Sequence, residues 1–226
     1  MCVGTNNADT ITGTNRADTI KARGGNDTVL ARGGKDKIFG GDGFDGLLDG
    51  GLGNDTLNAG PSAAGGFDYL TGGFGDDKLV ESPGVDRYIF EPGWGQDTIT
   101  GNGDQPGVQA DDDDLCFACG SASASVTVNL GTGTATDGTN TVTWDTTSSA
   151  FIESVVGGSG ADDLTGSSLS NAVNGSSGGD TITVSGDGGN DIVNCGSDTD
   201  ADTVTKDTAD FVVPNSCDGD LIINVP

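Results

Sequence analysis

The chain has 226 residues, with 41 Gly, 35 Asp or Glu, 9 Lys or Arg and no His, so its formal net charge at pH 7 is −26. Such an acidic chain has no basic patch for nucleic acid or for an anionic membrane surface, and without His it serves soft metals poorly. No apolar run is long enough to span a membrane. We therefore expect the partner to be a hard cation, which carboxylates and carbonyls bind well.

The acids recur with a period of nine residues. Asp18, Asp27 and Asp36 are nine residues apart, and each is followed two residues later by an aliphatic side chain. A solvated acidic tail has no reason to keep such a period, so the spacing indicates a structural repeat. If the acid is position 6 of the repeat, the acids of a first array are Asp9, Asp18, Asp27, Asp36, Asp45, Asp55, Asp68, Asp77, Asp86 and Asp97.

A second array follows the segment FIESVVGGSGADDLTG at 151–166. Its position 6 is Asp162, Asn171, Asp180, Asp191, Asp202 and Asp210. Position 8 is apolar or aromatic in both arrays: Ile11, Ile20, Val29, Ile38, Leu47, Leu57, Leu70, Leu79, Tyr88 and Ile99, then Leu164, Val173, Ile182, Val193, Val204 and Val212. Each repeat therefore pairs one acid with one candidate core residue.

The repeat predicts a short strand followed by a glycine-rich turn. Positions 7 to 9 alternate outward, inward and outward, which is a minimal strand with one buried side chain. Positions 1 to 6 are rich in glycine, which permits the positive φ angles of a tight turn. Two strands and two turns would complete a coil, and successive coils would stack as parallel strands about 4.8 Å apart. The expected fold class is all-β.

Stacking places the acid of each turn beside the acid of the turn one coil further on. Carboxylates this close repel one another, and Ca²⁺ between the turns would remove the repulsion by binding six to eight oxygens. One buried aliphatic side chain per repeat returns less free energy than ordering nine residues costs. We therefore predict that Ca²⁺ binding supplies much of the folding free energy and that the chain without Ca²⁺ is largely unfolded.

The segment GGLGNDTLN at 50–58 matches the pattern G-G-x-G-x-D-x-U-x, and the chain resembles the RTX (hemolysin-type) calcium-binding proteins. VDRYIFEPGWGQDTITG at 85–101 resembles the segment that often ends an RTX array. SVTVNLGTGTATDG at 125–138 resembles the lead-in to a new array, and the cysteine-bearing end from 194 resembles secreted actinobacterial-type members. The resemblance covers nearly the whole chain.

The resemblance implies a parallel β-roll that folds outside the cell on binding several Ca²⁺ ions. It implies ligation by the position-6 carboxylates and by turn carbonyls at positions 1 to 4. Carried over to this chain, the expected metal ligands are Asp9, Asp18, Asp27, Asp36, Asp45, Asp55, Asp68, Asp77, Asp86, Asp97, Asp162, Asp180, Asp191, Asp202, Gly25, Gly34, Gly43, Gly53 and Gly75. Position 4 is Asn7 and Arg16 in the first two repeats, and positions 1 and 2 are Ala22-Arg23 and Ala31-Arg32 in the next two. These N-terminal turns are therefore expected to be cap turns with weak or absent metal.

Three segments follow from these patterns. Residues 4–103 form the first array, 104–156 a strand-rich connector, and 157–226 the second array with a cysteine-stapled cap. The insertion GPSAAGG at 60–66 is expected to bulge one turn, and Pro83 and Pro92 leave the turns before Asp86 and Asp97 in doubt.

The cysteines favour an oxidising compartment. A disulfide between Cys195 and Cys217 would staple the open end of the coil. Cys116 and Cys119 form a C-x-x-C motif, which fits a redox motif, half a zinc site or a short structural bridge. Without a second C-x-x-C or a His, zinc is not expected, and Cys2 is left over. The run DDDD at 111–114 fits either a Ca²⁺ site or a solvated acidic loop before the strand LCFAC, and the solvated loop is the favoured interpretation.

No catalytic constellation is visible, so we do not expect an enzyme. The favoured function is a secreted, extracellular, calcium-binding structural component of a matrix, filament or surface layer. Such a component would associate with further copies end to end or edge to edge. The alternatives are the calcium-triggered carrier domain of a larger secreted enzyme or toxin, and a Ca²⁺-dependent adhesin.

Overall fold

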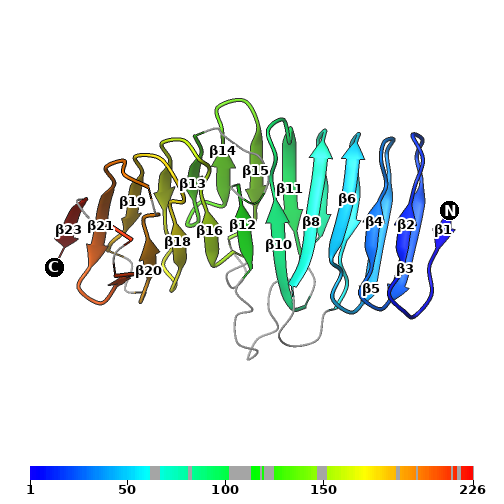
Figure 1. Cartoon of the computed structure of the whole chain (residues 1–226), viewed down its shortest axis with the longest axis horizontal. Coiled ribbons are helices and arrows are strands. Elements are labelled where there is room, and N and C mark those ends of the chain that lie inside the picture. The colour runs from blue at the N-terminus through cyan, green and yellow to red at the C-terminus, as the bar shows by residue number, and fades with distance from the viewer. Residues whose placement is uncertain are drawn as a thin grey trace.

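The computed structural model describes residues 1–61, 67–80, 83–101, 113–117, 119, 125–146, 152–186, 189–196, 198–214, 216–217 and 220–225. Over these residues the secondary structure consists of strands without a helix, and no helix is available there to cross a membrane. The strands stand side by side along one long axis, with the two chain termini at opposite ends (Figure 1).

The strands form two sheets that the chain visits in turn. The 13-stranded sheet contains, in spatial order, β1 (Cys2–Val3), β3 (Thr19–Gly24), β5 (Lys37–Asp42), β7 (Thr56–Asn58), β9 (Lys78–Val80), β11 (Gln96–Thr100), β15 (Thr141–Trp144), β14 (Thr134–Thr136), β13 (Thr127–Asn129), β17 (Asp163–Thr165), β19 (Thr181–Val184), β21 (Thr203–Asp207) and β23 (Leu221–Val225). The 10-stranded sheet contains β2 (Thr10–Thr12), β4 (Thr28–Leu30), β6 (Leu47–Leu52), β8 (Phe67–Phe74), β10 (Val85–Ile89), β12 (Asp114–Cys116), β16 (Ser154–Val156), β18 (Ala172–Asn174), β20 (Ile192–Asn194) and β22 (Phe211–Val212).

Neighbouring strands within each sheet are parallel, except around β14. The register advances by one coil per strand, as in the pairing of Ile20 with Ile38 and of Ile38 with Leu57. Between the two arrays, β13, β14 and β15 form an antiparallel meander that is inserted into the 13-stranded sheet, while β12 and β16 continue the other sheet. The predicted all-β parallel roll with two arrays and a strand-rich joining segment is confirmed.

The core is a row of inward-facing side chains between the two sheets. Position 8 fills this row in most repeats, and its fully or nearly fully buried members are Ile20, Val29, Ile38, Leu57, Leu70, Leu79, Tyr88, Ile99, Leu164, Val173, Ile182, Val193 and Val204. Ile11 and Val212, near the two ends, are only half-buried because no further coil covers them.

The prediction that Leu47 is a core residue is wrong. Leu48 is the fully buried residue of β6, and it pairs with Val29 and Leu70 in the neighbouring strands. This repeat has one residue more than the nine-residue period, since the next acid follows after ten. The extra residue lies between Asp45 and the inward position, so Asp45 keeps its place while the side-chain alternation shifts by one.

The middle of the roll is filled by aromatic residues. Phe90 stacks on Phe117 with ring centroids 5.2 Å apart, and Trp94 packs against both rings at 5.8 and 5.5 Å. Trp94 and Trp144 are both buried, so both are core residues. This cluster lies where the repeats give way to the connector, and it fills the space that aliphatic position-8 side chains fill elsewhere.

Outward-facing side chains on the second half of the 13-stranded sheet are mostly threonine. On β13 to β15, β17, β19 and β21 they are Thr127, Thr134, Thr136, Thr141, Thr143, Thr165, Thr181, Thr183, Thr203 and Thr205. The other outward-facing residues of these strands are Asn129, Asp163 and Asp207. The β-branched side chain of threonine suits a half-exposed strand surface.

Four of the five cysteines are in disulfides. Cys116 bonds to Cys119 and Cys195 bonds to Cys217, while Cys2 is free and half-buried. The Cys195–Cys217 bond joins the end of β20 to the segment before β23, which is the staple expected at the end of the second array. A structural bridge is therefore the state of the C-x-x-C motif.

Glycine at position 4 of the turns is required by the stacking of the coils. Gly34, Gly53 and Gly75 have φ angles of 136°, 132° and 139°, which L side chains rarely adopt. A Cβ on Gly53 would overlap the carbonyl oxygen of Gly34, and one on Gly75 would overlap that of Gly53. The backbone of each turn thus lies against the Cα of the glycine in the next coil.

Gly53→Ala is therefore expected to lower the free energy of unfolding by at least about 2 kcal/mol, from the strained φ together with the overlap. Gly46→Ala is the matched control, because a Cβ there would have its nearest neighbours at 3.7 and 3.9 Å. That variant should stay within about 0.5 kcal/mol of the parent. Urea unfolding in saturating Ca²⁺ measures both, and equal losses would contradict this account of the turn.

Candidate metal centre

The position-6 residues form two columns, one along each side of the roll. The column that precedes the 10-stranded sheet contains Asp9, Asp27, Asp45, Asp68, Asp86, Asp113, Glu153, Asn171, Asp191 and Asp210. The column that precedes the 13-stranded sheet contains Asp18, Asp36, Asp55, Asp77 and Asp97, and then Asp162, Asp180, Asp202 and Asp220. All but the outermost side chains are buried.

Each column is held together by one repeated hydrogen bond. The backbone N–H of one acid donates to Oδ1 of the acid one coil further on, as from Asp36 to Asp55 and from Asp55 to Asp77, both at 2.7 Å. At the meander Val142 and Val126 take the places of acids, and the bond resumes where the N–H of Val126 donates to Oδ1 of Asp162 at 2.7 Å. This bond fixes the carboxylate in the plane between two turns and leaves its second oxygen for another partner.

In many turns that second oxygen has no partner among the described residues. The aspartates whose buried Oδ2 lacks a hydrogen bond are Asp27, Asp36, Asp45, Asp55, Asp68, Asp77, Asp97 and Asp180. A buried carboxylate oxygen without a donor is costly, and buried polar groups of native proteins are rarely left so. We call these the open turns.

Other turns satisfy the second oxygen from within the chain. Thr14 donates both its N–H and its hydroxyl to Oδ2 of Asp18, each at 2.8 Å, and Thr5 does the same for Asp9 at 2.6 and 2.9 Å. The N–H of Gly158 donates to Oδ2 of Asp162 at 2.6 Å. We call these the capped turns. The turns of Asp9 and Asp18 thus have the geometry of cap turns, whereas the turns of Arg23 and Arg32, for which the same role was expected, are open.

The backbone at position 2 separates the two kinds of turn. In the open turns this residue has a left-handed φ: 91° at Gly51 and 90° at Gly73, and also 87° at Arg23, 78° at Arg32 and 79° at Ser176. Those last three are the non-glycine residues with positive φ among the described residues. Such a conformation costs a non-glycine residue about 1–3 kcal/mol and clusters at functional sites. The residues at position 2 of the capped turns, such as Thr14, do not have it.

The open turns bring a second kind of oxygen to the carboxylate. An ideal Cβ on Gly50, at position 1, would lie 2.6 Å from Oδ2 of Asp55 and 2.6 Å from the carbonyl oxygen of Gly72. Oδ2 of Asp45 and the carbonyl oxygen of Ala59 converge beside Gly40 in the same way. A carboxylate oxygen and a carbonyl oxygen that converge without a donor between them are the ligands that Ca²⁺ prefers.

Burial sets the protonation of these groups when no cation is present. It raises the pKa of Asp45 and Asp55 to about 7 and that of Asp97 to about 8, against the backbone N–H bond, which lowers it. In a capped turn, the hydroxyl and N–H of Thr14 hold the pKa of Asp18 below its ordinary value. Burial thus favours the protonated form of an open-turn carboxyl group, and ionising it leaves a negative charge that a divalent cation would balance.

The structure brings the predicted aspartates together, each in one of the two columns. Pro83 and Pro92 do not displace Asp86 or Asp97, which remain 0% and 3% exposed. The predicted glycines Gly25, Gly34, Gly43, Gly53 and Gly75 all have left-handed φ angles. The carbonyl oxygens of four of them, Gly25, Gly34, Gly53 and Gly75, face the glycine of the next coil. The inserted segment 62–66 lies outside the described residues.

Sequence reasoning missed three members of the columns. Asp113 and Glu153 continue the first column through the connector, and Asp220 ends the second. The interpretation of 111–114 as a solvated loop is wrong for Asp113 and Asp114, which are 2% and 4% exposed; residues 111 and 112 lie outside the described part. The missed signal was an acid followed two residues later by an aliphatic side chain, in Asp113–Leu115 and Glu153–Val155.

One further cluster of metal-binding side chains is already engaged. Cys195, Cys217 and Asp220 have ligand atoms within 4.8 Å of one another, but the two sulfurs are bonded to each other. A disulfide sulfur is not the thiolate that binds metal. The carboxylate columns therefore remain the candidate metal centre.

This fold and its stacked carboxylates define a calcium-binding β-roll. The family model for the RTX calcium-binding nonapeptide repeat, in four copies, matches residues 3–36, 12–47 and 32–63. Residues 3–63, in the first array, thus consist of RTX calcium-binding repeats, as the nonapeptide pattern indicated. No curated protein matches the chain. The second array has the same strand register and the same N–H to carboxylate bond.

Asp55→Asn should weaken folding in Ca²⁺ but stabilise the strand structure in chelator. In Ca²⁺ the variant loses a charged ligand, so the Ca²⁺ concentration at the folding midpoint should rise about tenfold or more, since even an outer-shell partner is worth about 10–100-fold. In chelator it removes a buried unpaired charge and should stabilise the strand structure. Asp163→Asn is the control, because Asp163 is an exposed residue of β17. It should leave the Ca²⁺ concentration at the folding midpoint within twofold of the parent and the strand content in chelator unchanged. Circular dichroism in both buffers decides, and an Asp55 variant that behaves like the Asp163 variant would remove Asp55 from the ligand set.

Low pH should stabilise the roll when no metal is bound. Because burial raises the pKa of Asp45 and Asp55 to about 7 from about 4 in an unfolded chain, their contribution to stability is present below about pH 4 and is lost as pH rises through about 7. In excess chelator the β-structure should therefore be greater at about pH 4.5 than at about pH 8. In Ca²⁺ the dependence should reverse, because the ligands must be ionised. A strand content independent of pH in chelator would contradict the buried-carboxylate account.

Proposed function

We propose that the chain is a secreted calcium-binding protein whose roll folds on several Ca²⁺ ions and serves as an extracellular structural component. The observation that carries the proposal is the set of buried Oδ2 atoms without a hydrogen-bond donor in the open turns. These turns are consecutive from Asp27 to Asp77 in the chain, so the cations would lie between the coils along both columns. Ligands would come from Asp27, Asp36, Asp45, Asp55 and their equivalents, together with the facing carbonyls.

Export of the unfolded chain, followed by folding outside the cell, is consistent with the expected Ca²⁺ affinity and with the two disulfides. Extracellular Ca²⁺ modules have dissociation constants of about 10⁻⁴–10⁻³ M, so such a chain would remain unfolded at the low Ca²⁺ of a cell interior and fold outside. The disulfides Cys116–Cys119 and Cys195–Cys217 are the kind of bond that persists in an oxidising compartment. Together these features support secretion.

A structural role is supported by the outer surfaces and ends of the roll. The sequence contains no His to act as a base, and the acids of the columns accept hydrogen bonds from the turns. The last strand of the 13-stranded sheet, β23, pairs on one side only, and its Leu221, Ile222 and Ile223 are 59%, 38% and 42% exposed. An unpaired apolar edge strand is a template for another chain, which supports end-to-end association.

Two alternatives have different signatures. As the carrier domain of a larger secreted enzyme or toxin, the roll would fold on Ca²⁺ and remain monomeric, and its gene would encode a catalytic domain as well. As a Ca²⁺-dependent adhesin, it would bind a surface glycan through a turn-bound ion. The exposed apolar edge favours the structural role over both.

Association should follow folding in Ca²⁺ and should depend on β23. Ile222→Lys places a charge on the edge, and it should abolish any oligomer that sedimentation velocity detects for the parent in Ca²⁺. Phe39→Lys is the control, because Phe39 is 41% exposed but lies within the sheet on β5, and it should leave the oligomer intact. A parent chain that folds in Ca²⁺ and remains monomeric would contradict the structural role while leaving calcium binding untouched.

A further inference from the structure

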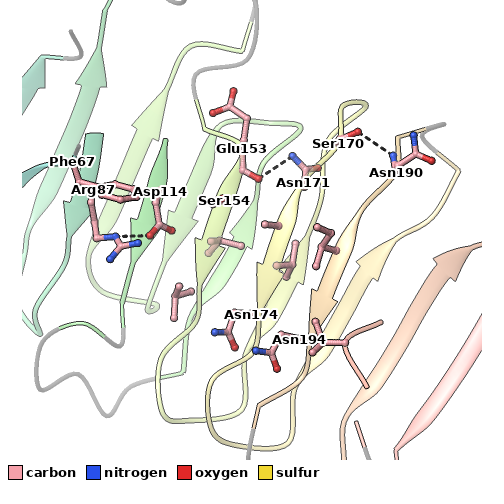
Figure 2. Close-up of a pocket in the computed structure, with 16 residues that line it drawn as sticks. Phe67, Arg87, Asp114, Glu153, Ser154, Ser170, Asn171, Asn174, Asn190 and Asn194 are labelled. Atoms are coloured by element: carbon pink, nitrogen blue, oxygen red, sulfur yellow. Dashed lines mark hydrogen bonds and ion pairs between the residues drawn. The ribbon is translucent and has the colours of Figure 1, made fainter. Parts of the chain in front are cut away.

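The outer face of the 10-stranded sheet carries a groove that neither the carboxylate columns nor the exposed edge strands explain. It encloses about 530 Å³ and crosses β10, β12, β16, β18 and β20, and Figure 2 shows the residues that line it. This volume is typical of a small-molecule site. The register explains the hollow: Arg87, Asp114, Ser154, Ala172 and Ile192 follow one another across the strands. The small Ser154 and Ala172 form a low floor between larger neighbours.

One wall of the groove is a charged pair set against aromatic rings. Nε of Arg87 donates to Oδ2 of Asp114 at 2.6 Å, and the guanidinium lies over the rings of Phe67 and Tyr69, at 5.1 and 5.7 Å from their centroids. Phe67 as a residue is 41% exposed. The wall therefore offers an apolar ring face beside a polar group whose charge is already neutralised.

Asp114 has an acceptor to spare. Its side chain is 5% exposed, and its Oδ1 has no hydrogen-bond partner among the described residues. A cation is disfavoured there, because the Arg87 guanidinium is bonded to the other oxygen of the same carboxylate. An uncharged hydroxyl donor satisfies this oxygen without that repulsion.

The far side of the groove offers donors. Asn174 and Asn194 lie directly opposite each other in β18 and β20, and they stand side by side in Figure 2. The Oδ1 of Asn174 accepts from the N–H of Ser176 at 3.0 Å, and that of Asn194 accepts from the N–H of Gly196 at 3.1 Å. These bonds fix both amides with their amino groups free of described partners. Asn174 lies two strands across the sheet from Asp114 and two residues further along the strand direction. The backbones of these two residues are therefore roughly 12 Å apart.

From this arrangement we propose that the groove binds an uncharged oligosaccharide. A sugar presents hydroxyls that both donate and accept, and a C–H face that packs on an aromatic ring. It would donate to Oδ1 of Asp114, accept from the amino groups of Asn174 and Asn194, and lie over Ser154 and Ala172 against Phe67. The net charge of −26 excludes acidic sugars from the preferred class. Calcium enters only by folding the roll, which distinguishes this site from one on a turn-bound ion.

The test uses the full chain in saturating Ca²⁺ on a printed panel of uncharged glucan, mannan, galactan, xylan and chitin oligomers, followed by calorimetry with the best binder. Ala172→Tyr fills the floor from an exposed position and should weaken binding at least about tenfold. Thr181→Tyr is the control, because Thr181 is the equivalent exposed residue of β19 in the opposite sheet; it should bind like the parent.

A second variant tests the proposed hydrogen bonds without filling the groove. Asn174→Ala combined with Asn194→Ala removes the two donors and should also weaken binding about tenfold or more, while circular dichroism reports the same strand content as the parent. The proposal is overturned if no uncharged oligomer binds the parent. It is overturned equally if a bound oligomer is unaffected by Ala172→Tyr, since the sugar would then lie on another surface.

Discussion

The bond from the backbone N–H of one turn to the carboxylate of the turn one coil further on is the interaction on which the roll depends. It uses one oxygen of each acid, as between Asp36 and Asp55, and it holds the coils in register on both sides of the core. Its cost is that carboxylates are buried in two columns with their second oxygens pointing into a space that holds carbonyls. A protein with this arrangement is stable only when something positive joins those oxygens, because buried unpaired charge is among the largest destabilising terms.

The two kinds of turn show how one motif serves two purposes. Thr5 and Thr14 satisfy the second oxygen with a hydroxyl and an N–H, so the first coils are closed by the chain itself. Arg23 and Arg32, at the corresponding place in the next turns, have left-handed backbones and leave that oxygen to a ligand. The strain at these arginines is understandable if cation binding compensates for it. The roll thus begins with turns that need no metal and continues with turns that do.

Much of this organisation could be predicted from periodicity. A nine-residue period with one acid and one aliphatic residue predicts a strand, a turn and a core position. The burial of Ile20, Val29 and Ile38 follows from the alternation of side chains along the strand. The period fails where a residue is inserted, as at Leu47 and Leu48, because one extra residue reverses which side chain faces inward. It also fails in the connector, where Asp113 and Glu153 are separated by a meander rather than by a fixed spacing. The choice between open and capped turns lies in backbone angles, and Arg23 and Arg32 at position 2 indicated cap turns where the structure has open ones. The groove could not be predicted either, since it depends on the register between strands distant in the chain.

The central claim is that Ca²⁺ between the carboxylate columns folds the roll. A far-UV circular dichroism titration with Ca²⁺, starting from the chelated chain at neutral pH and with Mg²⁺ as the control, tests it most directly. The account predicts a cooperative change from coil to β-structure in Ca²⁺ and little change in Mg²⁺, whose strict octahedral geometry and firmly held water suit a site of fixed carbonyls poorly. A full β spectrum that persists in excess chelator would show that the hydrophobic core and the disulfides suffice, and it would contradict the claim.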